Sequence, residues 1–366
     1  QLVALRRFAA SRLDESGDRS SAERRHARYH LNLAEDAGRV RTTPEFAPWM
    51  GRFEAVRDEL APAIDWSLAN EDRVTTLQAI PGLLEYWQRR GDFDPAYRYG
   101  IRMLEGAEAA APELRAYALM SAAFGAALTG DFPTAAQAPQ QALEMAGDAP
   151  GWQCGLWARM TRGQIATILG DLESVAAMGR EILELCDEHG LELQRAYGVS
   201  LLAEAEFFAD GDYAVARSLA DEAITGFRGL HDIGGLKMYG LSIAAPSAAL
   251  QGDLEAAEAY ATEAISLPGV AWTSAAYVIL GGYALLPKGD VERARHVLKR
   301  GTRLAYETSN EIWMRFGILF MARIAAADGD WEQAARLFGA CRPNLPAWGL
   351  QPRWWTDEPR VKVALG

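Results

Sequence analysis

Apolar residues recur along most of this chain at the three- and four-residue spacing of an amphipathic α-helix, with charged residues on the opposite face. Clear examples are residues 253–267 (DLEAAEAYATEAISL) and residues 290–304 (DVERARHVLKRGTRL). No segment alternates apolar and polar residues for long enough to suggest a sheet. The pattern therefore predicts an all-α fold.

A short motif recurs between the helical segments: Gly-Asp, then a bulky apolar residue, then a small residue three positions further on. The glycine is suited to end one helix in the left-handed conformation, and the aspartate is suited to cap the next helix. We expect the bulky residue to pack under the turn and the small residue to allow close helix contact. The copies begin at Gly91, Gly130, Gly170, Gly211, Gly252, Gly289 and Gly329.

This motif at a helix–helix corner resembles the tetratricopeptide repeat, whose usual period is about 34 residues. Here the copies are spaced by 39, 40, 41, 41, 37 and 40 residues. The longer period is similar to that of the sensor arms of large bacterial regulators of the maltose-activator and LuxR-like type. The resemblance implies a right-handed α-α superhelix, over residues 73–340, that holds a partner in its concave groove.

Residues 1–72 lack the motif but contain three helical segments, at 1–16, 21–35 and 49–68. Their order resembles the junction of predicted-ATPase regulators of the STAND class, where an Arg-Arg-His-x-x-Tyr helix and an Asp-Trp helix lead into the superhelix. The resemblance implies that residues 1–72 link the array to an upstream winged-helix and nucleotide-switch region. The matching positions are Arg24, Arg25, His26, Tyr29, Asp65 and Trp66.

The C-terminal residues 341–366 are dense in proline and tryptophan and cannot continue a helix. We expect them to fold back as a cap on the last repeat, with a partner-binding strip as the alternative. The chain also lacks an initial methionine and a signal-peptide pattern, which is typical of a segment of a longer polypeptide.

The charge, the hydropathy and the cysteine content indicate which classes of protein are unlike this chain. The net charge of −12, from 37 basic and 49 acidic residues, argues against direct nucleic-acid binding. No apolar run approaches the about 18–20 residues that would cross a membrane. Three widely spaced cysteines, Cys154, Cys186 and Cys341, suit a reducing cytoplasm.

No set of residues predicts catalysis. There is no phosphate-binding Gly-x-x-x-x-Gly-Lys-Ser/Thr loop, so we expect no nucleotide or other cofactor in this segment. His26 and His30 have the spacing of a zinc pair on one helix face, but no third ligand is indicated. Glu204 and Glu206 lie on different sides of a helix and do not form a carboxylate pair. We therefore expect a non-enzyme.

The first helix of each repeat is the candidate binding surface, because in a tetratricopeptide superhelix these helices line the groove. Positions about 13, 10 and 6 residues before each turn glycine include an unusual number of aromatic residues and methionines. They would form an apolar groove for a small molecule or an apolar helix, unless the longer helices turn these side chains into the core. The candidates are Tyr117, Met120, Phe124, Trp157, Met160, Gln164, Tyr239, Tyr283 and Phe316.

Three hypotheses for function follow. The first is the sensor arm of a cytoplasmic bacterial transcriptional regulator, in which an effector in the groove controls the upstream switch. The second is a general protein-interaction scaffold, and the third is the regulatory arm of a multidomain signalling enzyme. An exposed apolar groove would also make a homodimer plausible.

Overall fold

The computed structural model describes residues 2–41, 44–70, 73–147, 152–209, 211–229, 237–267, 270–308 and 310–341. Helices account for nearly all of these residues, and no β-strand occurs among them, which confirms the all-α prediction. In chain order the elements are α1 (Leu2–Ser16), α2 (Arg19–Arg39), η1 (Pro44–Phe46), α3 (Ala47–Ala69), α4 (Arg73–Gln78), α5 (Ile80–Arg90), α6 (Phe93–Leu104), α7 (Pro112–Thr129), α8 (Phe132–Gly147), α9 (Trp152–Leu169), α10 (Leu172–His189), α11 (Glu192–Phe208), α12 (Tyr213–Gly229), α13 (Lys237–Leu250), α14 (Leu254–Ile265), α15 (Val270–Ile279), η2 (Leu280–Leu285), α16 (Val291–Glu307), α17 (Glu311–Ala327) and α18 (Trp331–Cys341).

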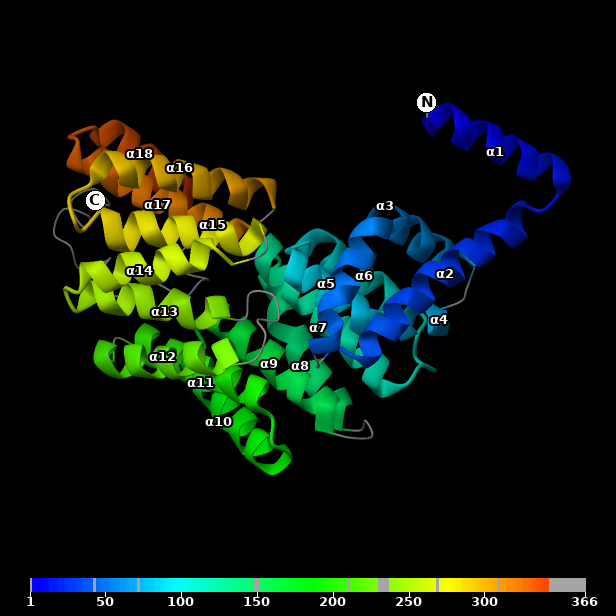
Figure 1. Ribbon diagram of the computed structural model, residues 1–366, viewed down its shortest axis with the longest axis horizontal. Coiled ribbons are helices and arrows are strands. Elements are labelled where there is room, and N and C mark those ends of the chain that lie inside the picture. The colour runs from blue at the N-terminus through cyan, green and yellow to red at the C-terminus, as the bar shows by residue number, and fades with distance from the viewer. Residues whose placement is uncertain are drawn as a thin grey trace.

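From α5 to α18 each helix packs against the next along the chain, so that successive helices form a curved stack (Figure 1). The stack is built from antiparallel pairs, beginning with α5–α6 and α7–α8 and ending with α17–α18. The curvature brings α17 back into contact with α7, although the two helices are far apart in sequence. The first helix of each pair therefore faces the inside of the curve.

The Gly-Asp motif stands at the corner of each pair. Six of the seven motif glycines have positive φ, between 78° at Gly170 and 93° at Gly130. Gly211 is the exception, because the chain at that corner is held instead by Glu206, whose carboxylate accepts a hydrogen bond from the Asp212 amide at 2.8 Å.

Most motif aspartates act as predicted. Asp171 accepts a hydrogen bond from the Ser174 amide at 3.1 Å, and the motif aspartates at five other corners make equivalent bonds to the first turn of the next helix. Asp92 is the exception, and the cap prediction is wrong there. Its carboxylate lies 2.6 Å from the Arg90 guanidinium instead of the helix amides.

The small motif residues are fully buried, as predicted, and this includes Val175. The bulky residues are less uniform. Phe93 is buried, whereas the others are half-buried or, in the case of Trp331, 51% exposed. Trp331 lies in the last described helix, so no later described helix covers it, and the expectation that it packs under its turn is wrong.

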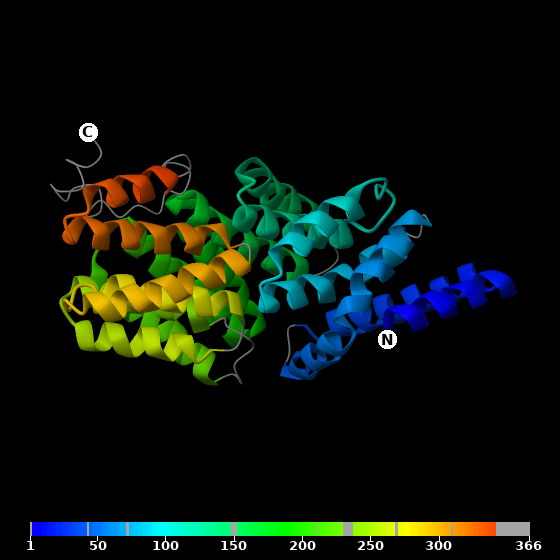
Figure 2. The same ribbon diagram turned by 90° about the horizontal axis from the view of Figure 1, so that it is seen from above.

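The front end of the chain packs directly on the first pair. Helices α2 and α3 contact each other, and α2 lies against α5. Phe53 of α3 stacks on Tyr86 of α5 with ring centroids 4.6 Å apart, within one continuous core. Helix α1 ends at Gly17, with φ of 76°, and projects away from the stack (Figures 1 and 2).

Proline and glycine residues modify several inner helices. The first inner helix is interrupted at Ala79, just before Pro81, whereas Pro246 lies within the continuous helix α13. Gly281 and Gly282 fall in η2, a π-helical segment, where a Cβ on Gly282 would overlap the ring of Phe320. The missing side chain lets η2 and α17 approach closely, which places Tyr283 on the inner face.

Of the predicted C-terminal cap, 341–366, all but Cys341 lies outside the described residues. Within the described part of the chain, no helix combines the length and the apolar character that a membrane span requires.

Candidate functional site

The inside of the curve holds a cavity that is partly enclosed by the stack. Its walls come only from inner helices, namely α7, α9, α11, α13, α15 with η2, and α17 with its N-terminal cap. The contact between α7 and α17 closes the ring. The lining residues are Phe124, Leu128, Gln164, Thr167, Ile168, Glu204, Phe207, Phe208, Met238, Tyr239, Ser242, Ile243, Pro246, Ile279, Tyr283, Asn310, Ile312, Trp313 and Phe316.

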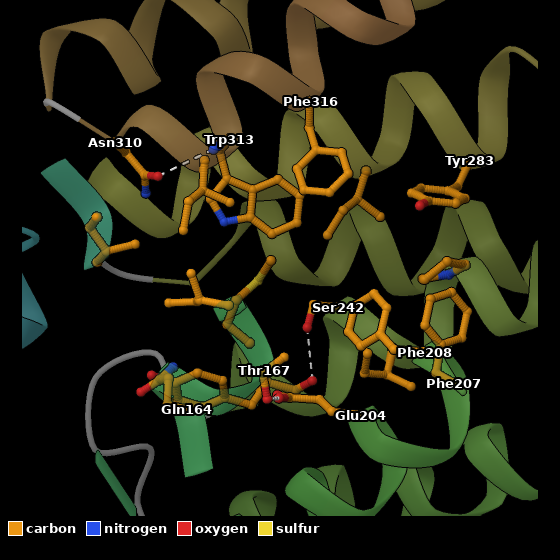
Figure 3. Close-up of a pocket in the computed structure, with 18 of the residues that line it drawn as sticks. Gln164, Thr167, Glu204, Phe207, Phe208, Ser242, Tyr283, Asn310, Trp313 and Phe316 are labelled. Carbon is orange, nitrogen blue, oxygen red and sulfur yellow. Dashed lines mark hydrogen bonds between the residues drawn. The ribbon is translucent and has the colours of Figure 1, made fainter. Parts of the chain in front are cut away.

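The cavity is of ligand size, and its lining is largely apolar. The centres of water molecules could occupy about 120 Å³ of it, which is about ten times the space that one water needs. Figure 3 shows Trp313 and Phe316 on one side of the space and Glu204 with Thr167 on the other. Such a site, apolar with a few polar groups, is typical of a small-molecule pocket.

Glu204 is the most unusual group in this wall. Its side chain is 5% exposed, and burial raises its pKa from 4.5 to about 7, against the lowering effect of a hydrogen bond from Thr167. The Thr167 hydroxyl donates to Glu204 Oε2 at 2.6 Å, while Oε1 has no hydrogen-bond partner among the described residues. An uncompensated carboxylate in an apolar site is costly, which favours its protonated form.

Thr167 can satisfy either protonation state of Glu204. Besides the bond to the carboxylate, its Oγ1 lies 3.2 Å from the carbonyl oxygen of Gly163, one turn earlier in α9. When Glu204 is protonated, its O–H can donate to Thr167 while Thr167 donates to Gly163. The Thr167 hydroxyl can thus stay hydrogen-bonded whether Glu204 is protonated or ionised.

A second polar group, Gln164, lies one turn before Thr167. Its Oε1 is 3.2 Å from the Tyr197 hydroxyl, which also donates to the Met160 carbonyl at 3.1 Å. Gln164 also hydrogen-bonds the side chain of Tyr239, although burial is the larger influence and raises the pKa of that tyrosine. Burial also raises the pKa of Tyr197, so both tyrosines are neutral at physiological pH.

Five of the nine predicted groove residues line this cavity: Phe124, Gln164, Tyr239, Tyr283 and Phe316. They come from five different inner helices, so the curvature brings together residues that span about half of the chain. Phe124, Gln164 and Tyr283 share the row six residues before the turn glycine. That row faces the inside of the curve most consistently.

The other four predicted residues do not line the cavity. Tyr117 is buried and hydrogen-bonds Arg41, whose guanidinium stacks on its ring at 4.6 Å. Met120 and Met160 are buried in the cores between adjacent helices, and Trp157 is half-buried against the same cores. The longer helices turn these positions towards the neighbouring pairs.

Sequence reasoning missed Glu204, Thr167 and the wall of Phe207, Phe208 and Trp313. For Glu204 the sequence predicts only that it does not form a carboxylate pair with Glu206. One signal could have found it: residues 200–208 (SLLAEAEFF) carry two glutamates in an otherwise apolar helix. A helix buried on several sides exposes few positions, so one of these glutamates is expected to be buried.

The remaining candidate chemistry does not form a second site. His26 Nε2 lies 3.1 Å from Glu59 Oε2, and burial lowers the pKa of His30. In the described residues, no three His, Cys, Asp or Glu side chains are grouped as metal ligands would be. Burial raises the pKa of the Cys154 thiol to about 12 and that of Cys186 to about 11, which makes both poor nucleophiles.

No protein-family model matches the chain, and a search of curated protein sequences finds no match either. The case for a function therefore rests on the cavity itself.

Proposed function

We propose that this chain is a non-catalytic sensor that binds a small effector in the cavity lined by α7 to α17. In this proposal the stack is a right-handed, tetratricopeptide-like superhelix with a period of about 40 residues, and it serves as the regulatory arm of a cytoplasmic bacterial transcriptional regulator. The observation that carries the proposal is the cavity, whose walls are formed by all the inner helices after α5.

The size of the cavity and the contact between α7 and α17 favour a small molecule over a peptide. A groove that binds a peptide helix must be open along its length. Here α17 lies against α7, so the inner face is bounded at both ends of the curve. A ligand of modest size would touch six helices or their caps at once.

Such contacts supply a mechanism. A ligand changes a conformational equilibrium only when it binds one state more tightly than the other. A ligand that bridges α17 and the inner helices from α7 onwards would favour the closed curvature over a more open one. Helix α5 packs on both α7 and α2, so a change of curvature would reach the front-end helices and, through them, an upstream switch domain of the same polypeptide.

We expect the Ser242→Phe variant to lose the binding of small apolar ligands. Ser242 lines the cavity, and among the described residues its hydroxyl donates only to the Tyr239 carbonyl within its own helix. A larger side chain would therefore fill the space at little other cost. In a thermal-shift screen of small amphipathic molecules, the unmodified chain should show saturable stabilisation, of about 2.7 kcal/mol at one hundred times Kd. Ser242→Phe should show none with the same compounds.

The matched control is Ser218→Phe, the same change at an exposed position of α12. It should respond as the unmodified chain does. Equal stabilisation of Ser242→Phe and Ser218→Phe would mean that the compounds bind elsewhere and would contradict the proposal. Stabilisation only by a protein fraction would support the alternative of an interaction scaffold or of the regulatory arm of a signalling enzyme, for which the exposed Phe8 of α1 offers a contact.

A further inference from the structure

We propose that the ligand of this cavity is a small amphipathic cation, a protonated amine attached to an apolar or aromatic body. This inference rests on the proposed sensor function and names the chemical class of its effector.

The charge of the cavity wall is the first argument. Among the described residues that line the cavity, Glu204 is the only Asp, Glu, Lys, Arg or His. An anionic ligand would lie beside this carboxylate with no lining cation to compensate it. A cation would instead form a neutral pair with Glu204, whose Oε1 accepts no hydrogen bond from the described residues. Charge-assisted hydrogen bonds of this kind are strong in a dry site.

The aromatic wall is the second argument. Aromatic side chains pack favourably against the apolar or aromatic body of such a ligand. Trp313 and Phe316 lie on the opposite side of the cavity from Glu204, with their ring centroids 5.5 Å apart (Figure 3). A ligand placed between the two sides would therefore meet the carboxylate with one end and aromatic rings with the other. Seven aromatic residues line the space: Phe124, Phe207, Phe208, Tyr239, Tyr283, Trp313 and Phe316.

The charged residues near the contact between α7 and α17 also favour a cationic ligand. Asn310 lines the cavity and also a neighbouring surface cleft between α6–α7 and α17. The only charged side chains in that cleft, among the described residues, are Asp94 and Glu311, and Glu311 is paired with Arg315 at 2.6 Å. The negative charge of the whole chain acts in the same direction on a diffusing cation.

Three probes of similar shape and different charge test this inference: 3-phenylpropylamine, 3-phenylpropan-1-ol and 3-phenylpropanoate. In calorimetric titrations at pH 7.5, the amine should bind the unmodified chain at least tenfold more tightly than the alcohol, and the carboxylate should bind most weakly. Glu204→Gln should bring the amine and the alcohol within about threefold of each other. The control Glu184→Gln, at an exposed position of α10, should keep the preference.

Amine binding should also release a proton. Because burial raises the pKa of Glu204 to about 7, its carboxyl is mostly protonated at pH 6 and must ionise to pair with an ammonium group. The apparent affinity for the amine should therefore rise about tenfold between pH 6 and pH 8. The other titratable groups around Glu204 are Tyr197 and Tyr239, with Tyr283 across the cavity, and burial raises the pKa of each, so they stay neutral. Glu85 also acts electrostatically on Tyr239, and Arg323 acts on Tyr283.

Equal or tighter binding of the alcohol or the carboxylate would overturn the inference, and so would an unchanged preference in Glu204→Gln or a failure of all three probes to bind. The sensor function is judged separately, by the dependence of any bound compound on Ser242. A neutral ligand that binds the unmodified chain but not Ser242→Phe would contradict the inference of a cationic ligand. It would still support the sensor function.

Discussion

Without ligand, the Glu204→Gln variant is expected to be about 3 kcal/mol more stable than the unmodified chain at pH 8, and less than about 1 kcal/mol more stable at pH 5. The reason is the pKa of Glu204, which is about 7 in the folded chain against an ordinary value of 4.5. That difference is worth about 3 kcal/mol.

The sign follows from proton binding. Between pH 4.5 and about 7, the folded state keeps the proton on Glu204 while the unfolded state has lost it. The free energy of unfolding therefore falls as pH rises through this window and changes no further above it. Glutamine resembles the protonated acid in shape and can still accept the hydrogen bond from Thr167. The variant therefore avoids this loss of stability at high pH.

Urea unfolding followed by circular dichroism at pH 5 and pH 8 measures this difference. Glu184→Gln removes an exposed carboxylate from α10 and should follow the unmodified chain at both pH values. If Glu204→Gln also had the same free energy of unfolding as the unmodified chain at both pH values, Glu204 would be solvated in solution. The cavity would then be more open than the structure describes.

Gly82→Ala is expected to destabilise the chain by about 3 kcal/mol or more. Helices α2 and α5 cross with their backbones in contact at this point, and a Cβ on Gly82 would overlap the carbonyl oxygen of Ala34 and come within 2.9 Å of the Gly38 amide nitrogen. Neither is the flexible end of a side chain, so the helices must separate. The change would also open the core around Phe53 and Tyr86.

In a helix, alanine is otherwise more favourable than glycine by about 1 kcal/mol. Gly82→Ala is therefore expected to be destabilising only because of the contact with α2. Gly51→Ala provides the control, because it lies in α3 with no atom within 4 Å of the added Cβ. Chemical denaturation should show Gly51→Ala as stable as the unmodified chain or more so. A Gly82→Ala variant of unchanged stability would mean that α2 does not pack on the stack, and that the proposed route from the cavity to an upstream domain fails.

The local geometry of the fold could be predicted because it depends on local chemistry. A left-handed glycine followed by a capping aspartate is stable with few other contacts, and Gly130 and Asp171 behave as expected. The prediction failed where another side chain, only a few residues away in the sequence, competed for the same groups. Asp92 pairs with Arg90, and the corner at Gly211 is held by Glu206.

The site was harder to predict, because it depends on how far the stack curves. The packing of α17 on α7 turns an open groove into a cavity, and no spacing in the sequence reports that contact. The sixth position before the turn was nevertheless informative, as Phe124, Gln164 and Tyr283 show. Tyr117 was misleading, since an aromatic residue at a helical position serves equally well in a core.

The most direct test of the ligand cavity is a crystal structure of the chain grown with 3-phenylpropylamine. Our account predicts one bound molecule among α7 to α17, with its nitrogen about 2.7–2.9 Å from Glu204 Oε1 and its ring against Trp313 or Phe316. A stack that is open between α7 and α17, or a space already filled by side chains with the amine bound elsewhere, would contradict it.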